Sequence, residues 1–583
     1  MATTTTVEPG SFLSGIGDRF LRGWADFRLG YAREPMKYTL LFAAVIILGM
    51  LVIYPVWLLF QFSIVDPKGG LTGQNYIEVM QRKDLFKALM NSMMLGVVVP
   101  VGCLLLGLPM AWMVSRTNMP GKLFVRAFAG IAFVIPSFIG TIGWIFLMAP
   151  NSGQLNKFFI AVFGLDKPLL DIFTMEGLAF ILIMHFYPLV FFAVSASLDN
   201  MDPSYEEAAR NLGAGRVRTA LTITMPLVTP AVLSGALLCI LDALAAFGAP
   251  AALGFPGGFH VLTTKIYTLI LHPPKFELAA AVAVPIVFFT AACLLVQKWW
   301  LGRSRYTTLT GKAGQASAVD LGHWRWAAFG LCLFVIFFSV LLPMGGLFIL
   351  SLLNTFGAPI EFRNMVLENY EIFFDDTFIV IQSIKNSFIL SISTATLCVM
   401  LGIAYVWIVE RTEIVGRGSV TVIIMITFAF PAVAMGVGIL IGYINWLYGS
   451  LWILFVAYMA KKIPFAYIFL RNAIKQIMEE LEEAARIAGA SWARMVWDIT
   501  IPLMKTGMWV AWVLIFSISL RELAMSILLA QPGTETMAVA VYQFLDDGAV
   551  EHAAAVSVLI AFLSVATVVI ARKIAGKGAL EVD

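Results

Sequence analysis

Charged residues are scarce in this chain of 583 residues. Asp, Glu, Lys and Arg make up 13% of it, whereas hydrophobic residues make up 60%. Soluble domains contain about 25% charged residues, so this chain is too poor in charge to cover its surface against water. The composition excludes a soluble globular protein and indicates a polytopic membrane protein. A net charge of +3, without any basic run, also argues against a nucleic-acid partner.

Residue groupings that hold metals or cofactors are missing as well. The five cysteines stand singly in apolar runs, with no C-x-x-C pair and no histidine cluster, and are predicted to be core or lipid-facing residues. No Ser/His/Asp or metal-ligand grouping falls on matched helix faces, so we expect no catalytic residue, no metal site and no cofactor bound by this chain. The phosphate loop G-x-x-x-x-G-K-[ST] is absent too, because Gly311-Lys312 is followed by Ala313 and lacks the leading glycine.

Long apolar runs make up most of what is present. About 20 apolar residues cross a bilayer as a helix, which satisfies its own backbone hydrogen bonds. Continuous rather than alternating runs favour helices over barrel strands. The sequence therefore predicts an all-α polytopic membrane protein with about 12 transmembrane helices. The predicted spans lie at 38–62, 88–114, 123–148, 177–198, 226–248, 278–301, 324–352, 386–409, 419–446, 449–472, 502–528 and 552–571.

The distribution of Lys and Arg predicts the orientation. Basic residues gather before the first span, in alternate loops, around the central linker and after the last span, and these segments are predicted to be cytoplasmic. Both termini are therefore expected in the cytoplasm. The predicted organisation is a cytoplasmic N-terminal segment (1–37), a first transmembrane domain (38–301), a cytoplasmic linker (302–322), a second transmembrane domain (323–573) and a cytoplasmic tail (574–583).

The two halves repeat one another. Six spans separate equivalent loops, so the repeat is parallel, with a pseudo-twofold axis along the membrane normal. The offset between equivalent positions changes by 295 − 276 = 19 residues, which places an insertion between spans three and four of the first half. A short interfacial helix is expected there, around 155–164. The matches at offset 295 are Arg116-Thr117 with Arg411-Thr412 and Pro136 with Pro431, and those at offset 276 include Pro188 with Pro464 and Pro226 with Pro502.

A polar segment occurs in both halves between apolar spans. It runs from Glu206 to Gly213 and again from Glu482 to Gly489. In each copy, adjacent alanines provide a face without bulk, which another surface can approach closely. The glycine is expected to end a short helix in a conformation that a Cβ atom would penalise. Because the same polar segment occurs twice with the same residue spacing, it is predicted to be a docking element and not an ordinary connector between spans. Its candidate residues are Glu206, Glu207, Ala208, Ala209, Arg210, Gly213, Glu482, Glu483, Ala484, Ala485, Arg486 and Gly489.

These segments resemble the E-A-A-x3-G-x9-I-x-L-P loop of the permease subunits of binding-protein-dependent ABC importers, with Met225 or Ile501 in place of the Leu. The resemblance covers nearly the whole chain. It implies that each loop is a coupling helix docked on a cytoplasmic ATPase, that two copies of this ATPase use the ATP, and that the chain itself is not an enzyme. It also implies a periplasmic or lipid-anchored solute-binding protein as partner and a multi-pass location in the lipid of the bacterial inner membrane.

The fused, double-length form resembles the ferric iron importer permeases, a group also similar to the thiamine and 2-aminoethylphosphonate permeases. The segments 133–140 and 520–523 are typical of this wider group and do not separate its substrates. Ferric iron is the first prediction for the cargo. The alternatives are thiamine or an anionic organophosphorus solute, such as 2-aminoethylphosphonate or a phosphate ester.

Six ionisable residues fall inside the predicted spans, where charge is costly and usually faces a cavity or a partner. One interpretation is that they line the translocation route, and their bias toward positive charge would then suit an anionic cargo. The other is that they pair structurally, Arg521 with Glu522 and the lysines with Asp242. The two interpretations can coexist. The residues are His185, Asp242, Lys461, Lys462, Arg521 and Glu522.

Two rival classes of function are weighed against the importer. An ion-coupled secondary transporter would have spans broken at Gly or Pro and acidic ion sites, and it leaves both polar loops unexplained. A membrane-embedded enzyme would need a clustered His/Asp/Glu site, which five histidines spread from His185 to His552 do not supply.

Overall fold

The computed structural model describes residues 31–32, 35–66, 68–202, 204–271, 273–303, 319–375, 379–414 and 416–575. Most of the predicted segments 1–37, 302–322 and 574–583 lies outside these residues. The described residues form helices, with three isolated β-bridges. One bridge joins Val319, at the end of the linker, to Thr117 in the loop after α5. The all-α prediction is confirmed.

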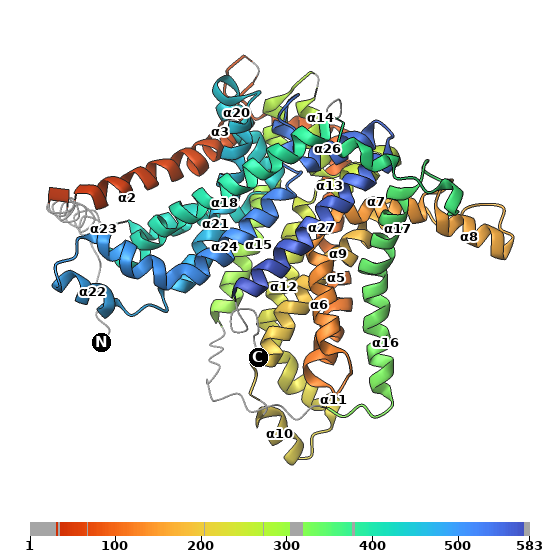
Figure 1. Ribbon diagram of the computed structural model, residues 1–583, viewed down its shortest axis with the longest axis horizontal. Coiled ribbons are helices and arrows are strands. Elements are labelled where there is room, and N and C mark those ends of the chain that lie inside the picture. Colours follow the sequence, from red (N-terminus) through yellow and green to blue (C-terminus); the bar gives the residue numbers. More distant parts are fainter. Residues whose placement is uncertain are drawn as a thin grey trace, which may run out of the picture.

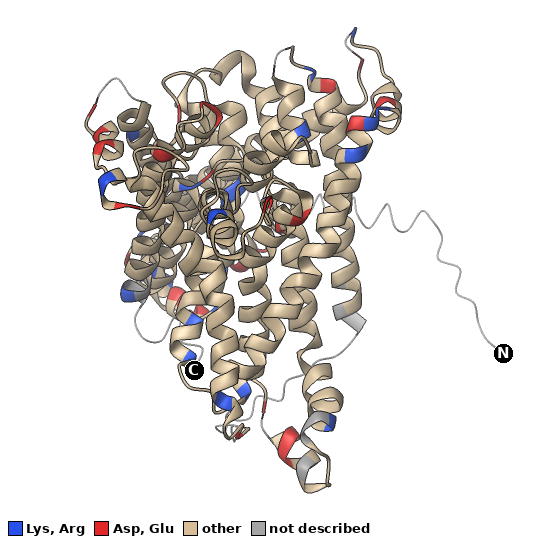
Figure 2. Ribbon diagram, turned by 90° about the vertical axis from the view of Figure 1, so that its right-hand side faces the viewer, with Lys and Arg blue, Asp and Glu red and all other residues tan. Residues whose placement is uncertain are grey.

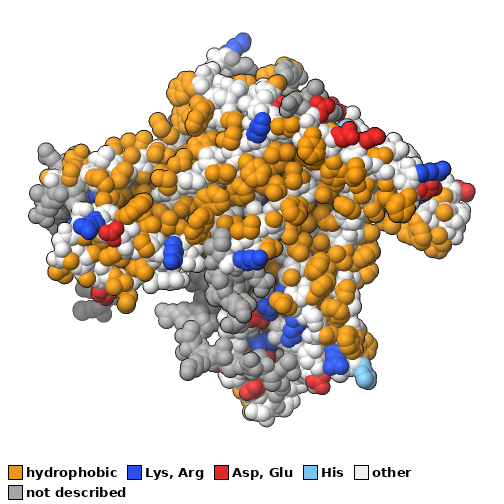
Figure 3. Space-filling view, viewed as in Figure 1, with side chains coloured by type: hydrophobic (Ala, Val, Ile, Leu, Met, Phe, Trp, Pro, Cys, Tyr) orange, Lys and Arg blue, Asp and Glu red, His pale blue; other side chains and the backbone are white. Residues whose placement is uncertain are grey.

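Ten of the described helices are long and apolar enough to cross a membrane. Charged side chains gather toward the two ends of these helices, as Figure 2 shows, and Figure 3 shows a broad hydrophobic surface over their middle. The ten are α2–η1–α3 (Pro35–Ser63), α5 (Lys83–Arg116), α9 (Met175–Asp199), η2–α12 (Ala220–Ala245), α15 (Phe276–Arg303), α16–η3–α17 (Trp324–Leu352), α18 (Ile379–Arg411), α21 (Leu451–Ile474), α23–η6–α24 (Trp492–Leu520) and α27 (Val550–Ala575).

Two further predicted spans, 123–148 and 419–446, are not straight helices. The first divides into α6 (Lys122–Val134) and α7 (Ser137–Met148), which meet at 96°, and the second into α19 (Arg417–Ala429) and α20 (Ala432–Leu447), which meet at 111°. Each break falls at the repeated proline, Pro136 or Pro431. Proline lacks the N–H group that a helix needs and disfavours the helical conformation in the residue before it. Each of these two predicted spans is therefore broken at its proline, and the chain has ten to twelve candidate membrane-crossing helices in its described residues.

Four spans contain a π-helical turn that ends just before a proline. These turns are η1 (Gly49–Ile53), η2 (Ala220–Thr224), η3 (Phe337–Leu341) and η6 (Val496–Thr500). The wider turn accommodates a proline ring that would clash with the preceding turn of a regular α-helix. The turns before Pro226 and Pro502 are repeat equivalents. The turns before Pro55 and Pro343 show that these two prolines are equivalent as well, although they were not matched in the sequence.

Short helices cover the two ends of the molecule. The insertion in the first half forms α8 (Gln154–Phe163), at the position where a short interfacial helix is expected. Two of its apolar side chains, Phe158 and Phe163, are exposed, as the membrane interface would require. The remaining short helices are α4 (Gln74–Gln81), α10 (Ser204–Asn211), α11 (Arg216–Thr219), α13 (Gly248–Gly257), α14 (Leu262–Ile270), η4 (Phe362–Asn364), η5 (Glu368–Phe373), α22 (Glu479–Ile487), α25 (Ser526–Leu529) and α26 (Met537–Asp546).

The first span of each half packs against the other half. Helix α3 lies on α20, and α17 lies on α7 (Figure 1). Both contacts are close enough to require glycine. A Cβ atom at Gly438 of α20 would lie 2.6 Å from the carbonyl oxygen of Pro55, and one at Gly143 of α7 would lie 2.1 Å from that of Pro343. The two contacts are equivalent under the repeat, so the halves are joined by a reciprocal exchange of their first spans.

Candidate functional site

The two repeated polar segments form the short helices α10 and α22. In Figure 1, α10 lies at the bottom of the molecule and α22 at its left edge, each beyond the ends of the spans of its own half, while α14 and α26 lie together in the upper part. Each helix begins with acidic residues in its first turn, where they favour the positive end of the helix dipole. Each predicted docking helix thus lies at the end of its own half that points away from α14 and α26.

A buried glutamate anchors α22 to the spans. Glu482 is 5% exposed, and its Oε2 atom lies 2.9 Å from Nε of Arg411, the last residue of α18. The other carboxylate oxygen accepts a hydrogen bond of 3.0 Å from Thr500, in the π-turn η6. Arg411 also donates to the carbonyl oxygens of Ile474 and Ile477 and to Glu479. The base of α22 is therefore tied to both α18 and the span that contains α24.

The equivalent glutamate anchors α10 in the first half. Glu206 is 7% exposed and accepts a hydrogen bond of 2.6 Å from Thr224, in η2. Its Oε1 atom lies 3.7 Å from Nε of Arg116, the last residue of α5, and Arg116 donates to the carbonyl oxygen of Met201. The same three side-chain types hold both helices, and the contact to arginine is looser in the first half.

Glycine ends both helices as the sequence predicts. Gly213 has a φ of +83° and Gly489 a φ of +87°, a left-handed conformation that favours a residue without Cβ. The next residue closes the turn in each case, since Ala214 N–H donates to Ala209 and Ala490 N–H donates to Ala485, both at 3.0 Å. No heavy atom lies within 4 Å of a Cβ built on either glycine, so these positions face open space.

The outer surface of each helix is exposed and carries apolar side chains. Leu212 and Ile487 are each 88% exposed, although both are large and hydrophobic. The exposed residues include four of the predicted docking residues, namely Glu207, Ala208, Glu483 and Ala484. Ala209 and Ala485 are partly buried, Arg486 is exposed, and the side chain of Arg210 is not described. A small, mixed surface of this kind is suited to docking a partner protein.

The structure thus divides the predicted residues into two groups. Glu206 and Glu482 face the spans and position the helices, whereas the motif glutamates Glu207 and Glu483 face outward. The sequence analysis used Arg116 and Arg411 only to detect the repeat and did not assign them to the site. Their recurrence at the end of the same span in both halves was the signal that could have identified them.

One of the ionisable residues within the spans caps a broken helix. The ammonium group of Lys461, on α21, donates to the carbonyl oxygens of Thr427 at 2.8 Å and Phe430 at 2.5 Å, at the end of α19. The break leaves carbonyl groups without helical partners inside the membrane, and Lys461 helps to satisfy them. Its repeat equivalent, His185 on α9, lies close to the backbone of Ala132, near the end of α6.

The other ionisable residues within the spans do not all pair as the sequence suggested. Glu522 forms a buried ion pair with Lys462 rather than with its neighbour Arg521. Asp242, on α12, interacts electrostatically with Lys461, in line with the predicted pairing of Asp242 with the lysines. It makes no ion pair with a described residue. Charges from α12, α21 and the segment after α24 therefore meet across the two halves.

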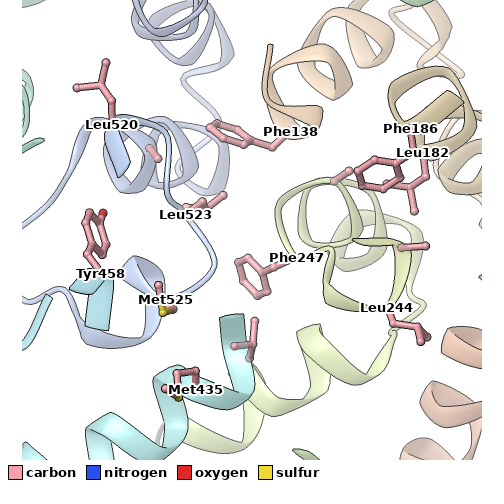
Figure 4. Close-up of a cluster of buried hydrophobic side chains, with 14 of the residues drawn as sticks. Phe138, Leu182, Phe186, Leu244, Phe247, Met435, Tyr458, Leu520, Leu523 and Met525 are labelled. Carbon is pink, nitrogen blue, oxygen red and sulfur yellow. The ribbon is translucent and has the colours of Figure 1, made fainter. Parts of the chain in front are cut away.

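A buried apolar cluster surrounds this region and joins the halves (Figure 4). It contains three pairs of residues that are equivalent at offset 276, namely Leu182 with Tyr458, Leu244 with Leu520, and Phe247 with Leu523. A Cβ atom at Gly248 would lie 2.6 Å from Cβ of Phe138 and 3.0 Å from Cδ2 of Leu523. Equivalent segments of the two repeats thus pack closely against one another at the centre of the molecule.

Comparison with known proteins identifies relatives over most of the chain. The family model "Binding-protein-dependent transport system inner membrane component" matches residues 104–306 and 407–576, together more than half of the chain. The first match includes α10 and the second includes α22.

Individual relatives are less than 30% identical. The chain is similar to the Fe(3+)-transport system permease protein FbpB 2 of Haemophilus influenzae, with 26% identity over 94% of this chain and 99% of the relative. It is also similar to the ferric transport system permease protein FbpB of Actinobacillus pleuropneumoniae, with 23% identity over 87% and 74%. The molybdenum transport system permease protein ModB of Haemophilus influenzae, at 29% identity, covers 39% of this chain and 97% of its own length.

Proposed function

The chain belongs to the family of binding-protein-dependent transport system inner membrane components, and from this premise we propose that α10 and α22 are the coupling helices through which two copies of a cytoplasmic ATPase drive an import cycle. As a fused permease of this family, the chain contains both halves of the translocation unit. ATP is used by the partner subunits. A solute-binding protein, periplasmic or lipid-anchored, delivers the cargo at the opposite face.

The observation that carries the proposal is the pair of exposed helices, each with a buried anchor to the spans of its own half. An unpartnered Leu212 or Ile487 at the surface is explained if a second protein covers it. A rigid anchor is equally needed, because a docked helix transmits force only if it moves together with the spans. The ties from Glu482 to α18 and to the span of α24 meet this requirement.

The import cycle follows from this arrangement. ATP binding would close the ATPase dimer and bring α10 and α22 toward one another. Each helix would carry its anchored spans with it, so that the halves rock about the pseudo-twofold axis and open the route to the binding protein. The ATPases thereby bias an equilibrium between two states of the permease, since they bind one state more tightly.

Ferric iron is the proposed cargo. Two relatives that align along most of this chain are ferric permeases by name. Thiamine and an anionic organophosphorus solute are the alternatives, because segments 133–140 and 520–523 are typical of the wider group. An ion-coupled transporter gains some support from the broken helices α6–α7 and α19–α20, but it assigns no role to α10 and α22.

The proposed location is the bacterial inner membrane, with both termini in the cytoplasm beside α10 and α22. The proposed domains remain 38–301 and 323–573, joined by the linker 302–322. Fusing a reporter enzyme that is active only in the periplasm to the C-terminus tests the orientation. Reporter activity from that fusion would contradict it.

Copurification tests the coupling proposal. The full chain, extracted in mild detergent, should retain two ATPase subunits by native mass spectrometry. The double variant Gly213→Asp/Gly489→Asp should lose them, because it forces a side chain into a left-handed turn at the docking surface. Gly258→Asp/Gly548→Asp is the matched control, since these glycines have φ of +68° and +80° and equally open surroundings, but lie in the loops beside α13 and α26 at the other end. Loss of the ATPase in the control, or its absence from the wild type, would contradict the proposal.

A further inference from the structure

The three cations Lys461, Lys462 and Arg521 lie within or directly after the spans of the second half and differ in their partners. Lys461 caps α19, and Lys462 pairs with Glu522. Arg521 makes no hydrogen bond and no ion pair through its side chain with any residue that the structure describes. Arg521 is only partly buried as a residue, but its Nη1 atom is shielded from solvent and has no hydrogen-bond partner among the described residues. A shielded donor without a partner is costly, so the retention of Arg521 calls for an explanation.

A structural role does not supply that explanation. Arg521 is the residue that ends α24, where a basic side chain could bind the last carbonyl groups of the helix. Lys461 performs this task for α19, but the guanidinium of Arg521 donates to no described carbonyl group. Its neighbour Glu522 is within electrostatic range but is already engaged by Lys462.

Arg521 stands in the sequence between Leu520 and Leu523, two members of the apolar cluster that contains residues of both halves (Figure 4). It is also electrostatically coupled to His185 of the first half. Its repeat equivalent at offset 276 is Ala245, so only one of the two halves brings a guanidinium group to this level.

The charges around Arg521 do not balance one another. Lys461, Lys462 and Arg521 contribute three positive charges, and Asp242 and Glu522 contribute two negative charges. The region is therefore short of one negative charge. Asp242 does not compensate Arg521, because its carboxylate interacts with Lys461 instead.

We propose that Arg521 is an anion-binding position on the translocation route, which receives an oxyanion carried by the cargo. This inference rests on the proposed function as an import permease. A guanidinium group presents donors in a planar fork that matches the oxygens of a phosphate, phosphonate or carboxylate. For an iron cargo, the metal then crosses this level together with a bound oxyanion, because a bare ferric ion would be repelled by Arg521. For an organophosphorus cargo, the oxyanion is part of the solute.

The test measures binding and uptake by the full chain. In nanodiscs of zwitterionic lipid, the wild type should bind radiolabelled phosphate saturably at one site per chain. Arg521→Gln should weaken this binding at least 10-fold, and Arg521→Lys should weaken it less. Arg325→Gln serves as control, because it removes the same charge from an exposed position at the start of α16, and it should bind as the wild type does. Absence of saturable binding in the wild type, or equal binding by Arg521→Gln, would overturn the inference.

Uptake into proteoliposomes that contain the ATPase and binding protein distinguishes the possible sources of the oxyanion. Radioactive iron(III) supplied with phosphate, and separately 2-aminoethylphosphonate, are offered to the wild type and to Arg521→Gln. The variant should reduce uptake of the true cargo at least 10-fold. Retention of two ATPase subunits by native mass spectrometry shows that the variant is folded and assembled. Wild-type uptake of the phosphonate alone would overturn ferric iron as cargo and leave the anion site standing. Uptake at the wild-type rate by Arg521→Gln would overturn the anion site and leave the permease function standing.

Discussion

Nε of Arg411 lies 2.9 Å from Oε2 of Glu482, and both side chains are less than a tenth exposed. This ion pair joins the end of α18 to the first turn of α22. The equivalent atoms of Arg116 and Glu206 are 3.7 Å apart. The molecule therefore holds its two proposed coupling helices with the same residue types, and the contact between arginine and glutamate is shorter in the second half.

The first prediction concerns this anchor. Removing one member of a buried ion pair leaves a charge without its partner, at a cost of about 3–5 kcal/mol. Arg411 retains Glu479 and two carbonyl groups after Glu482→Ala, so we expect a smaller loss of about 2 kcal/mol. ATP hydrolysis should continue while uptake falls, because α22 no longer moves with its spans. Thermal unfolding and the ratio of uptake to ATP hydrolysis measure the two effects.

The neighbouring Glu483→Ala is the control for stability, since Glu483 is exposed and its loss should change stability by less than about 0.5 kcal/mol. Glu206→Ala should be milder than Glu482→Ala, because its contact to arginine is longer. Equal loss of stability in Glu482→Ala and Glu483→Ala would argue against an anchoring role.

The second prediction concerns the cap of the broken helix α19. Lys461→Met would leave the carbonyl groups of Thr427 and Phe430 without a donor inside the membrane. Each buried group left unsatisfied costs about 1–3 kcal/mol, and the thermal unfolding temperature should fall markedly. Lys461→His, which copies the first half, should recover part of the loss. A methionine variant as stable as the wild type would show that the cap is dispensable.

The third prediction concerns the contact of α7 with the first span of the second half. Gly143→Ala would place a Cβ atom 2.1 Å from the carbonyl oxygen of Pro343, so the two helices must separate. Overpacking of this kind costs about 1–3 kcal/mol. Gly140→Ala, on the same helix, meets nothing within 4 Å and should be neutral or slightly stabilising. Chemical denaturation of the two variants, compared side by side, decides whether this approach is as close as described.

The fourth prediction follows from the exchange of first spans. Each half expressed alone would lack the helix that covers its α7 or α20 and should be degraded or aggregate. Residues 1–310 and 311–583 expressed together should assemble, because the cut falls in the linker and leaves every packing contact intact. Copurification through a tag on one half is the measurement. A stable, monodisperse first half on its own would contradict the structural exchange.

Much of the architecture follows from the sequence because membrane insertion depends on local composition. A run of apolar residues becomes a helix wherever it lies, so the spans, the repeat and the helix α8 could be predicted from the order of residues. The positive φ of Gly213 and Gly489 could be predicted for the same reason, since the ending of a helix is a local event. The bends at Pro136 and Pro431 were missed because proline is tolerated within many membrane helices, as it is in α9 and α21.

The sequence by itself determined that this chain is an all-α membrane protein with about twelve spans in two repeated halves, and it predicted the two polar loops. Only the tertiary structure decided which charge meets which. Glu522 pairs with Lys462, Lys461 binds the end of α19, Arg521 makes no ion pair with a described residue, and Glu482 turns inward while Glu483 faces out. These choices depend on distances between residues that are 31 or more positions apart or on which side of a helix faces the spans, and no local pattern encodes them. The loops could therefore be located from the sequence, whereas their anchors required the fold.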